Sequence, residues 1–134
     1  MTATMKRLDH VNLRTGNLDA MVAWYGRILD LRPGPRPGFP FPGAWLYAAG
    51  QPIIHLVGRE ATPGAGPDEL RLEHFAISAE GLKDFLALLE AEGVPARLNH
   101  IRDFGIIQVN IHDPDGNHIH IDFAAAEMEG AEGV

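Results

Sequence analysis

The chain of 134 residues contains no cysteine, and this absence excludes disulfide bonds and thiolate metal sites. Any metal ion that the protein binds must therefore be held by nitrogen and oxygen ligands. A chain without cysteine also suits a reducing compartment, and we expect a cytoplasmic protein. With 46% hydrophobic and 22% charged residues, the chain is most simply one compact domain, residues 1–134.

Long apolar runs and a concentrated basic segment are absent too. No stretch approaches the roughly eighteen apolar residues that a membrane span requires, and no apolar segment of the signal-peptide type is present. The eleven lysine and arginine residues are scattered along a chain of net charge −7. Nucleic-acid binding requires a concentrated basic face, so we expect neither a nucleic-acid nor a membrane partner.

The sequence does contain a pair of histidines that occurs twice. Leu-Asp-His10 opens the first half and Leu-Glu-His74 opens the second, an offset of 64 (74 − 10). Near the ends of the halves, His55 is echoed by His120, an offset of 65 (120 − 55). A single histidine on an inward strand face is more often a hydrogen-bonded core residue than a ligand. Four histidines at repeat-related positions favour a metal site built by duplication.

The two halves have the same order of predicted elements, βαβββ. In the first unit, about 8–58, we expect a strand, a helix, a proline-rich edge segment and a hairpin, at residues 10–14, 20–29, 32–43 and 44–57. In the second unit, about 71–123, we expect a strand, a helix and three strands, at residues 71–78, 82–92, 95–101, 106–112 and 117–123. The linker 59–70 is rich in Gly, Pro and Ala, and residues 124–134 are expected to form a frayed tail. This repeat predicts an α+β fold.

Strand alternation suggests a role for each polar residue near the histidines. His118 lies two residues from His120 on one strand face, about 7 Å away between Cα atoms, so it could reach a metal-bound substrate without ligating the metal. His118 and His55 are therefore candidate catalytic bases. The alternative, which we favour slightly for His118, is simple exposure to solvent beside the turn at 113–116. Asp9 and Glu73 alternate away from the predicted ligands, and a role toward solvent or the backbone suits them better than metal binding.

Aromatic and arginine side chains could complete a substrate site. Four aromatic residues of the first unit are candidate pocket walls: Phe39, Phe41, Trp45 and Tyr47. The alternative for Trp45 and Tyr47 is packing under the helix at 20–29. Arginine pairs bidentately with carboxylate, so three arginines are candidate anchors for an anionic substrate: Arg14, Arg32 and Arg36. Most surface arginines have no such role.

These motifs resemble those of the vicinal oxygen chelate superfamily, which includes glyoxalase I, extradiol dioxygenases and bleomycin-resistance proteins. The resemblance covers about residues 8–123 and is most specific at Leu-Asp-His10-Val and at Asp-Pro-Asp-Gly-Asn-His-Ile-His120-Ile. It implies two βαβββ repeats that pair into a curled mixed sheet, with a divalent metal held by His10, His55, His74 and His120. The position of His120 is usually glutamate, and that of His55 is often glutamate or glutamine. An all-imidazole set favours a transition metal such as zinc, nickel or iron over magnesium, manganese or calcium.

The resemblance leaves three functions open. The first is an enzyme in which a small oxygenated substrate chelates the metal and a base moves a proton, as in isomerases, epimerases and lyases. The second is a ring-cleaving iron dioxygenase, whose usual two-histidine, one-carboxylate triad is not matched because His120 replaces the carboxylate. The third is a protein that sequesters a ligand without chemistry, although a binder needs none of the four histidines. The resemblance also implies a homodimer, because the units must pair within one chain or between two.

Overall fold

Each half of the chain folds as the same βαβββ unit. The computed structural model describes residues 6–64 and 72–128, and the chain divides into its two units between Pro63 and Gly64. The first unit contains β1 (Val11–Thr15), α1 (Leu18–Leu29), β2 (Arg32–Pro33), β3 (Gly43–Ala48) and β4 (Gln51–Gly58). The second contains β5 (Phe75–Ser78), α2 (Leu82–Ala91), β6 (Arg97–Ile101), the 3-10 turn η2 (Arg102–Phe104), β7 (Ile106–His112) and β8 (His118–Ala124). The expectation that both units form one domain stays a prediction.

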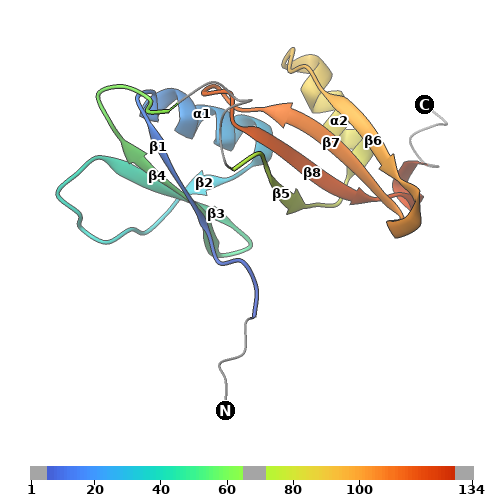
Figure 1. Ribbon diagram of the computed structural model, residues 1–134, viewed down its shortest axis with the longest axis horizontal. Coiled ribbons are helices and arrows are strands. Elements are labelled where there is room, and N and C mark those ends of the chain that lie inside the picture. Colours follow the sequence, from blue (N-terminus) through green and yellow to red (C-terminus); the bar gives the residue numbers. More distant parts are fainter. Residues whose placement is uncertain (1–5, 65–71, 129–134) are drawn as a thin grey trace. The chain divides into compact units, whose positions relative to one another are not determined.

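The two sheets have equivalent topologies, which confirms the predicted α+β fold. The strand orders are β1-β4-β3-β2 in the first unit and β5-β8-β7-β6 in the second. In each sheet the first and last strands of the unit pair in parallel, and the other pairs are antiparallel (Figure 1). Val11 pairs with Ile54 as Phe75 pairs with Ile119, so the strand register keeps the offsets of 64 and 65.

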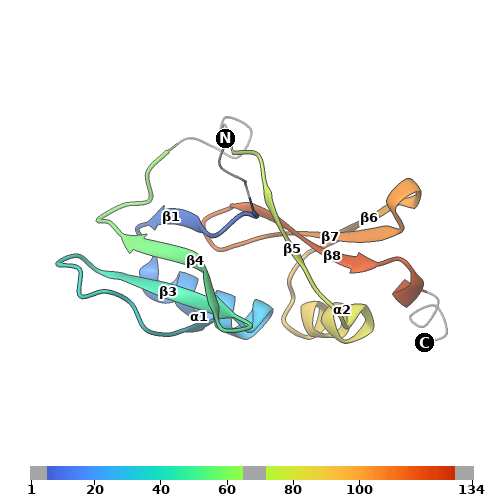
Figure 2. The same cartoon turned by 90° about the horizontal axis from the view of Figure 1, so that it is seen from below.

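Each helix covers one apolar face of the sheet in its own unit (Figure 2). In the first unit the buried side of α1 includes Met21 and Tyr25, and the sheet contributes the buried Leu46 and Ile54. In the second unit Leu82, Phe85 and Leu89 of α2 take this role, and the Phe85 ring lies 5.6 Å from that of Phe123 on β8. Because strand side chains alternate, the residues between these apolar positions lie on the opposite face of each sheet. The predicted site histidines are on that face.

The proline-rich segment forms an edge and a loop, as expected. Its only strand, β2, pairs with β3 alone, because proline lacks the amide donor that an inner strand needs. The loop after β2 folds back over Tyr47, whose hydroxyl donates to the Pro35 carbonyl at 2.5 Å. A Cβ on Gly34 would come within 2.7 Å of the Tyr47 ring, so this close approach requires glycine.

The opening strand of the second unit is shorter than expected. Strand β5 begins at Phe75, whereas the sequence predicted a strand from residue 71, which lies outside the described residues. Likewise, β1 begins at Val11, one residue after His10. The alternation of side chains along a strand therefore does not fix the directions of the residues just before β1 and β5. These residues are Asp9, His10, Glu73 and His74.

The prediction of a frayed tail is wrong for residues 124–128. Ala124 ends β8, and the Ala125 amide donates to the Gly105 carbonyl at 2.7 Å. The Glu127 carboxylate accepts from the amides of Gly81 and Leu82 at 3.0 and 2.9 Å. These donors begin α2, where the N-cap residue is a glycine without a side chain, and a carboxylate there also faces the positive end of the helix dipole. Residues 129–134 lie outside the described part of the chain.

No helix among residues 6–64 and 72–128 is long and apolar enough to cross a membrane.

Candidate metal centre

The turn between β7 and β8 sets the start of the strand that carries the site histidines. The Asp113 side chain is buried, and its Oδ1 accepts from the amides of Asp115 and Asn117 at 3.0 and 2.9 Å. Its Oδ2 accepts from Asn117 Nδ2 at 2.8 Å. Three bonds to one carboxylate fix the turn, so β8 begins at His118 in a defined register with β7.

One face of β7 and β8 carries a row of polar side chains. Asn110 lies opposite His120, and His112 lies opposite His118. The rings of His112 and His118 stack with centroids 5.2 Å apart. The ring of His74, which precedes β5, lies 4.4 Å from that of His120 and 5.3 Å from that of His118. The second unit therefore gathers predicted ligands His74 and His120 with the candidate base His118.

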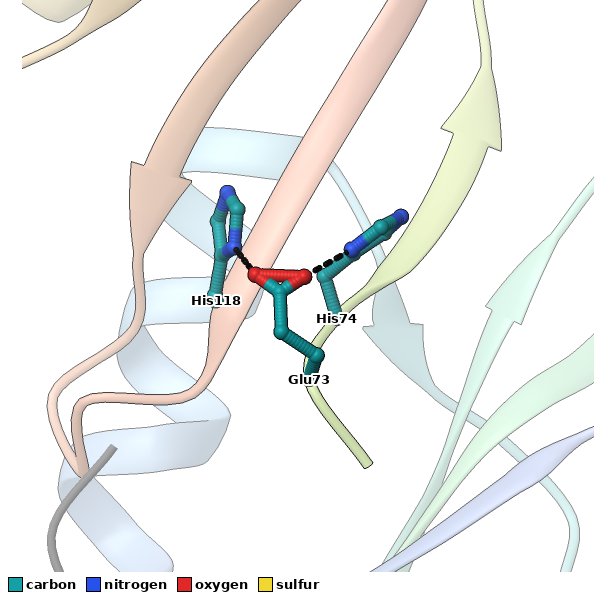
Figure 3. Close-up of side chains that lie close together, drawn as sticks. All are labelled: Glu73, His74 and His118. Atoms are coloured by element: carbon teal, nitrogen blue, oxygen red, sulfur yellow. Dashed lines mark hydrogen bonds and ion pairs between the residues drawn. The ribbon is translucent and has the colours of Figure 1, made fainter. Parts of the chain in front are cut away.

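A carboxylate that was not assigned to this site connects two of the histidines (Figure 3). Glu73 Oε2 lies 2.5 Å from His74 Nδ1, and its Oε1 lies 2.9 Å from His118 Nδ1. The hydrogen bonds from His74 and then His118 lower the pKa of Glu73 below its usual value. The expectation that Glu73 points away from the predicted ligands is wrong, because it precedes β5 and is not governed by strand alternation. The expected solvent exposure of His118 is also wrong, since its side chain is 16% exposed.

Three of the four predicted ligands have a carboxylate at Nδ1. Glu73 is bonded to His74, Asp122 Oδ1 lies 2.6 Å from Nδ1 of His120, and Asp9 Oδ1 lies 2.8 Å from Nδ1 of His10. An imidazole that donates Nδ1–H to a carboxylate keeps the lone pair on Nε2, which is the usual arrangement of a metal-binding histidine. The expectation that Asp9 points away from the predicted ligands is wrong as well, and the hydrogen bond from His10 lowers the pKa of Asp9.

In the first unit, His10, His55 and Trp45 form a stack of near-parallel rings. The His55 ring lies 3.8 Å from His10 and 4.0 Å from Trp45, each with an interplanar angle of 10°. His55 Nε2 donates to the Pro52 carbonyl at 3.0 Å, and burial and then the neighbouring His10 lower the pKa of His55. Imidazole lone pairs lie in the ring plane, so two rings stacked face to face cannot both direct them at one ion. In this arrangement only one of the two histidines can ligate.

The other predicted pocket residues make contacts of their own. Phe39 and Phe41 stack with centroids 5.0 Å apart, and the Arg36 guanidinium lies 5.0 and 5.2 Å from the two rings. Arg32 forms an exposed ion pair with Asp30 at 2.9 Å. Arg14 is exposed on β1, on the sheet face of His55. The substrate-binding roles of Arg14, Phe39, Phe41, Trp45 and Tyr47 stay predictions.

The second unit has a donor set compact enough for a cation. In the described part of the chain, ligand atoms of Glu73, His74 and His118 all lie within 4.8 Å of one another. A cavity of about 10 Å³, the size of one water molecule, is lined by these three residues and by Leu72, Phe75, Gly116 and Asn117. Sequence reasoning missed Glu73, although Asp9 and Glu73 stand at the same offset of 64 (73 − 9) as the histidines that follow them.

The comparisons with known proteins agree on a fold. The family model described as Glyoxalase/Bleomycin resistance protein/Dioxygenase superfamily matches residues 7–121. A comparison with curated proteins found no significant match. A glyoxalase family protein from Bacillus anthracis has a TM-score of 0.75 at 22% identity, over 92% of this chain and 99% of its own. Lactoylglutathione lyase from Agrobacterium tumefaciens has a TM-score of 0.69 at 18% identity, over 92% and 98%. At such identities the likeness establishes the fold alone.

Proposed function

The chain belongs to the Glyoxalase/Bleomycin resistance protein/Dioxygenase superfamily, and we propose that it is a metal-dependent enzyme that binds a small oxygenated substrate by chelation. One observation carries the proposal. His74 and His120 lie 4.4 Å apart between ring centroids, and each has a carboxylate at Nδ1. Both imidazoles are thus arranged to offer Nε2 to an ion. In the first unit His10 has Asp9 at its Nδ1, and its role as a ligand stays a prediction.

The chemistry of this donor set fits a divalent transition ion. Imidazole nitrogens suit zinc, nickel and iron, whereas magnesium and calcium prefer oxygen ligands. The carboxylates of Glu73 and Asp122 contact the histidines and are not proposed as metal ligands. They raise the basicity of the imidazoles without occupying coordination positions on the ion. When bound, the ion supplies a Lewis acid that polarises the substrate oxygens.

The proposed reaction transfers a proton, as in an isomerase, epimerase or lyase, and needs a base with a directed lone pair. Of the two candidates, His118 has one nitrogen near Glu73 and the other near Asn110 Oδ1. His55 donates Nε2–H to Pro52, and no other hydrogen bond of its ring is present among residues 6–64 and 72–128, so Nδ1 is the lone-pair nitrogen. We therefore assign the role of base to His55 and do not count His55 among the metal ligands. Its stack with Trp45 holds the ring orientation.

Metal analysis and two substrate assays test the proposal. Protein purified without added ions should contain one divalent transition ion per chain. It should exchange the α-proton of small α-hydroxycarbonyl compounds with solvent deuterium. Removal of the ion with a chelating agent should stop this exchange, and adding the ion back should restore it. Oxygen uptake with catechols, without such exchange, would instead indicate the ring-cleaving dioxygenase. Tight binding of a ligand by metal-free protein, without turnover, would indicate the sequestering function.

We also propose a homodimer. Each four-stranded sheet has open edges at its outer strands, β1 and β2 in one unit and β5 and β6 in the other. Its polar histidine face is also not covered by the helix of its own unit, so units must pair to complete a site. Light scattering at micromolar concentration should give twice the chain mass of 14.6 kDa. A metal-loaded monomer under these conditions would contradict the dimer.

A further inference from the structure

Glu73 differs from the other carboxylates near the histidines because it contacts two imidazoles. Asp9 and Asp122 have one histidine each, His10 and His120. Glu73 uses Oε2 for His74 and Oε1 for His118, as Figure 3 shows. Its side chain is 66% exposed, and an exposed glutamate samples many rotamers unless both ends of the carboxylate are held.

His118 is itself held in a fixed orientation by Asn110. Asn110 is buried, and its Nδ2 donates to the carbonyls of Arg97 and Gln108 at 3.1 and 3.5 Å. These bonds direct Oδ1 at His118, whose Nε2 lies 2.8 Å away and must act as the donor. The other edge of the ring then faces Glu73. Glu73 also accepts, so both contacts are hydrogen bonds only while both ring nitrogens of His118 carry a proton.

The bond from Glu73 decides which nitrogen of His74 carries the proton. Neutral histidine in water prefers the proton on Nε2, which would block the nitrogen that the proposed metal site requires. A carboxylate at Nδ1 reverses this preference, because it accepts only from a protonated Nδ1. The first unit repeats the device with Asp9 and His10, at an offset of 64.

We propose that Glu73 is a positioning residue that fixes the Nδ1–H tautomer of His74. The inference rests on the proposed function, because the tautomer matters to the protein only if His74 ligates a metal. Glu73 and His118 are then neither ligands nor bases. Glu73 acts on the metal through the His74 ring alone.

Two measurements on the same variants test this role. The first is long-range ¹H–¹⁵N NMR of metal-free protein at pH about 8, where unperturbed imidazoles are neutral. Wild type should show a protonated Nδ1 on His74, and Glu73→Ala should shift the proton to Nε2. The second is calorimetric titration with Zn²⁺, in which Glu73→Ala should lower affinity by about 10- to 100-fold without changing the stoichiometry.

Further variants separate positioning from other roles. Glu73→Asp should keep the His74 tautomer, because the shorter Asp9 makes the equivalent bond to His10. His118→Phe keeps a ring beside His112 but removes the contact with Glu73, so it should shift the tautomer less than Glu73→Ala does. Glu80→Ala, at an exposed acidic residue of the same unit, is the matched control and should change nothing.

Two results would overturn the proposal. One is an unchanged His74 tautomer in Glu73→Ala. The other is complete loss of zinc in both Glu73→Ala and His118→Phe, which would make these residues ligands themselves, together with His74. If wild type binds no Zn²⁺, the proposed function fails, but the NMR comparison still decides whether Glu73 sets the tautomer.

Discussion

Alanine at His74 or His120 should abolish stoichiometric metal binding, with a loss of affinity greater than the roughly 100-fold that a residue acting through a ligand can cause. The expectation follows from the position of these rings, 4.4 Å apart and each with a carboxylate at Nδ1. Removing either ring takes away one of the proposed nitrogen ligands. The ligands that remain cannot hold a transition ion against dilution.

The measurement is metal content by mass spectrometry after loading with Zn²⁺ or Ni²⁺ and gel filtration. His100→Ala and His112→Ala are the controls, since both histidines are exposed in the same unit and neither is a proposed ligand. His112 is the stricter control because its ring stacks on His118. Circular dichroism should confirm that all four variants fold. Equal metal content in His74→Ala and wild type would refute the site.

Asp113→Ala should destabilise the protein by about 3 kcal/mol, equivalent to about 10 °C in melting temperature. The buried carboxylate accepts three hydrogen bonds from Asp115 and Asn117. Alanine leaves these donors, on half-buried residues, without their acceptor. Because the turn sets the start of β8, unfolding of this region would also displace His118 and His120.

Urea unfolding followed by circular dichroism measures the effect. Asp103→Ala, at an exposed residue of η2, is the control and should stay within about 0.5 kcal/mol of wild type. Asp113→Asn should give an intermediate loss, because the amide keeps one acceptor but directs an NH₂ group toward Asn117. A free energy of unfolding for Asp113→Ala equal to that of the control would mean that the turn does not depend on this carboxylate.

The duplicated architecture could be predicted from the sequence because it depends on periodicity. Apolar alternation and the offsets of 64 and 65 appear directly in the residue order, and the pairs Val11–Ile54 and Phe75–Ile119 repeat the same offsets in the register. The proline-rich edge was equally predictable, because the missing amide of proline excludes an inner strand. These features follow from local chemistry alone.

The contacts around the histidines could not be predicted in the same way. Asp9 and Glu73 precede strands that begin later than expected, so alternation gave the wrong direction for both side chains. Asn110 enters the site only through the register of β7 against β8, which depends on the turn at Asp113. The stack of His10, His55 and Trp45 joins residues from three separate segments. The spacing of these residues in the sequence does not predict the angles between their rings.

The contact of the Glu127 carboxylate with α2 determines where a truncated version of the protein should end. The family match ends at residue 121, whereas β8 continues to Ala124 and Glu127 accepts from the first amides of α2. A truncated chain that follows the family boundary would end inside a strand and lose the acceptor for those amides. Inactivity of such a truncation would report damaged folding of the second unit rather than missing catalytic groups. A boundary after Met128 avoids this confusion in deletion or fusion experiments.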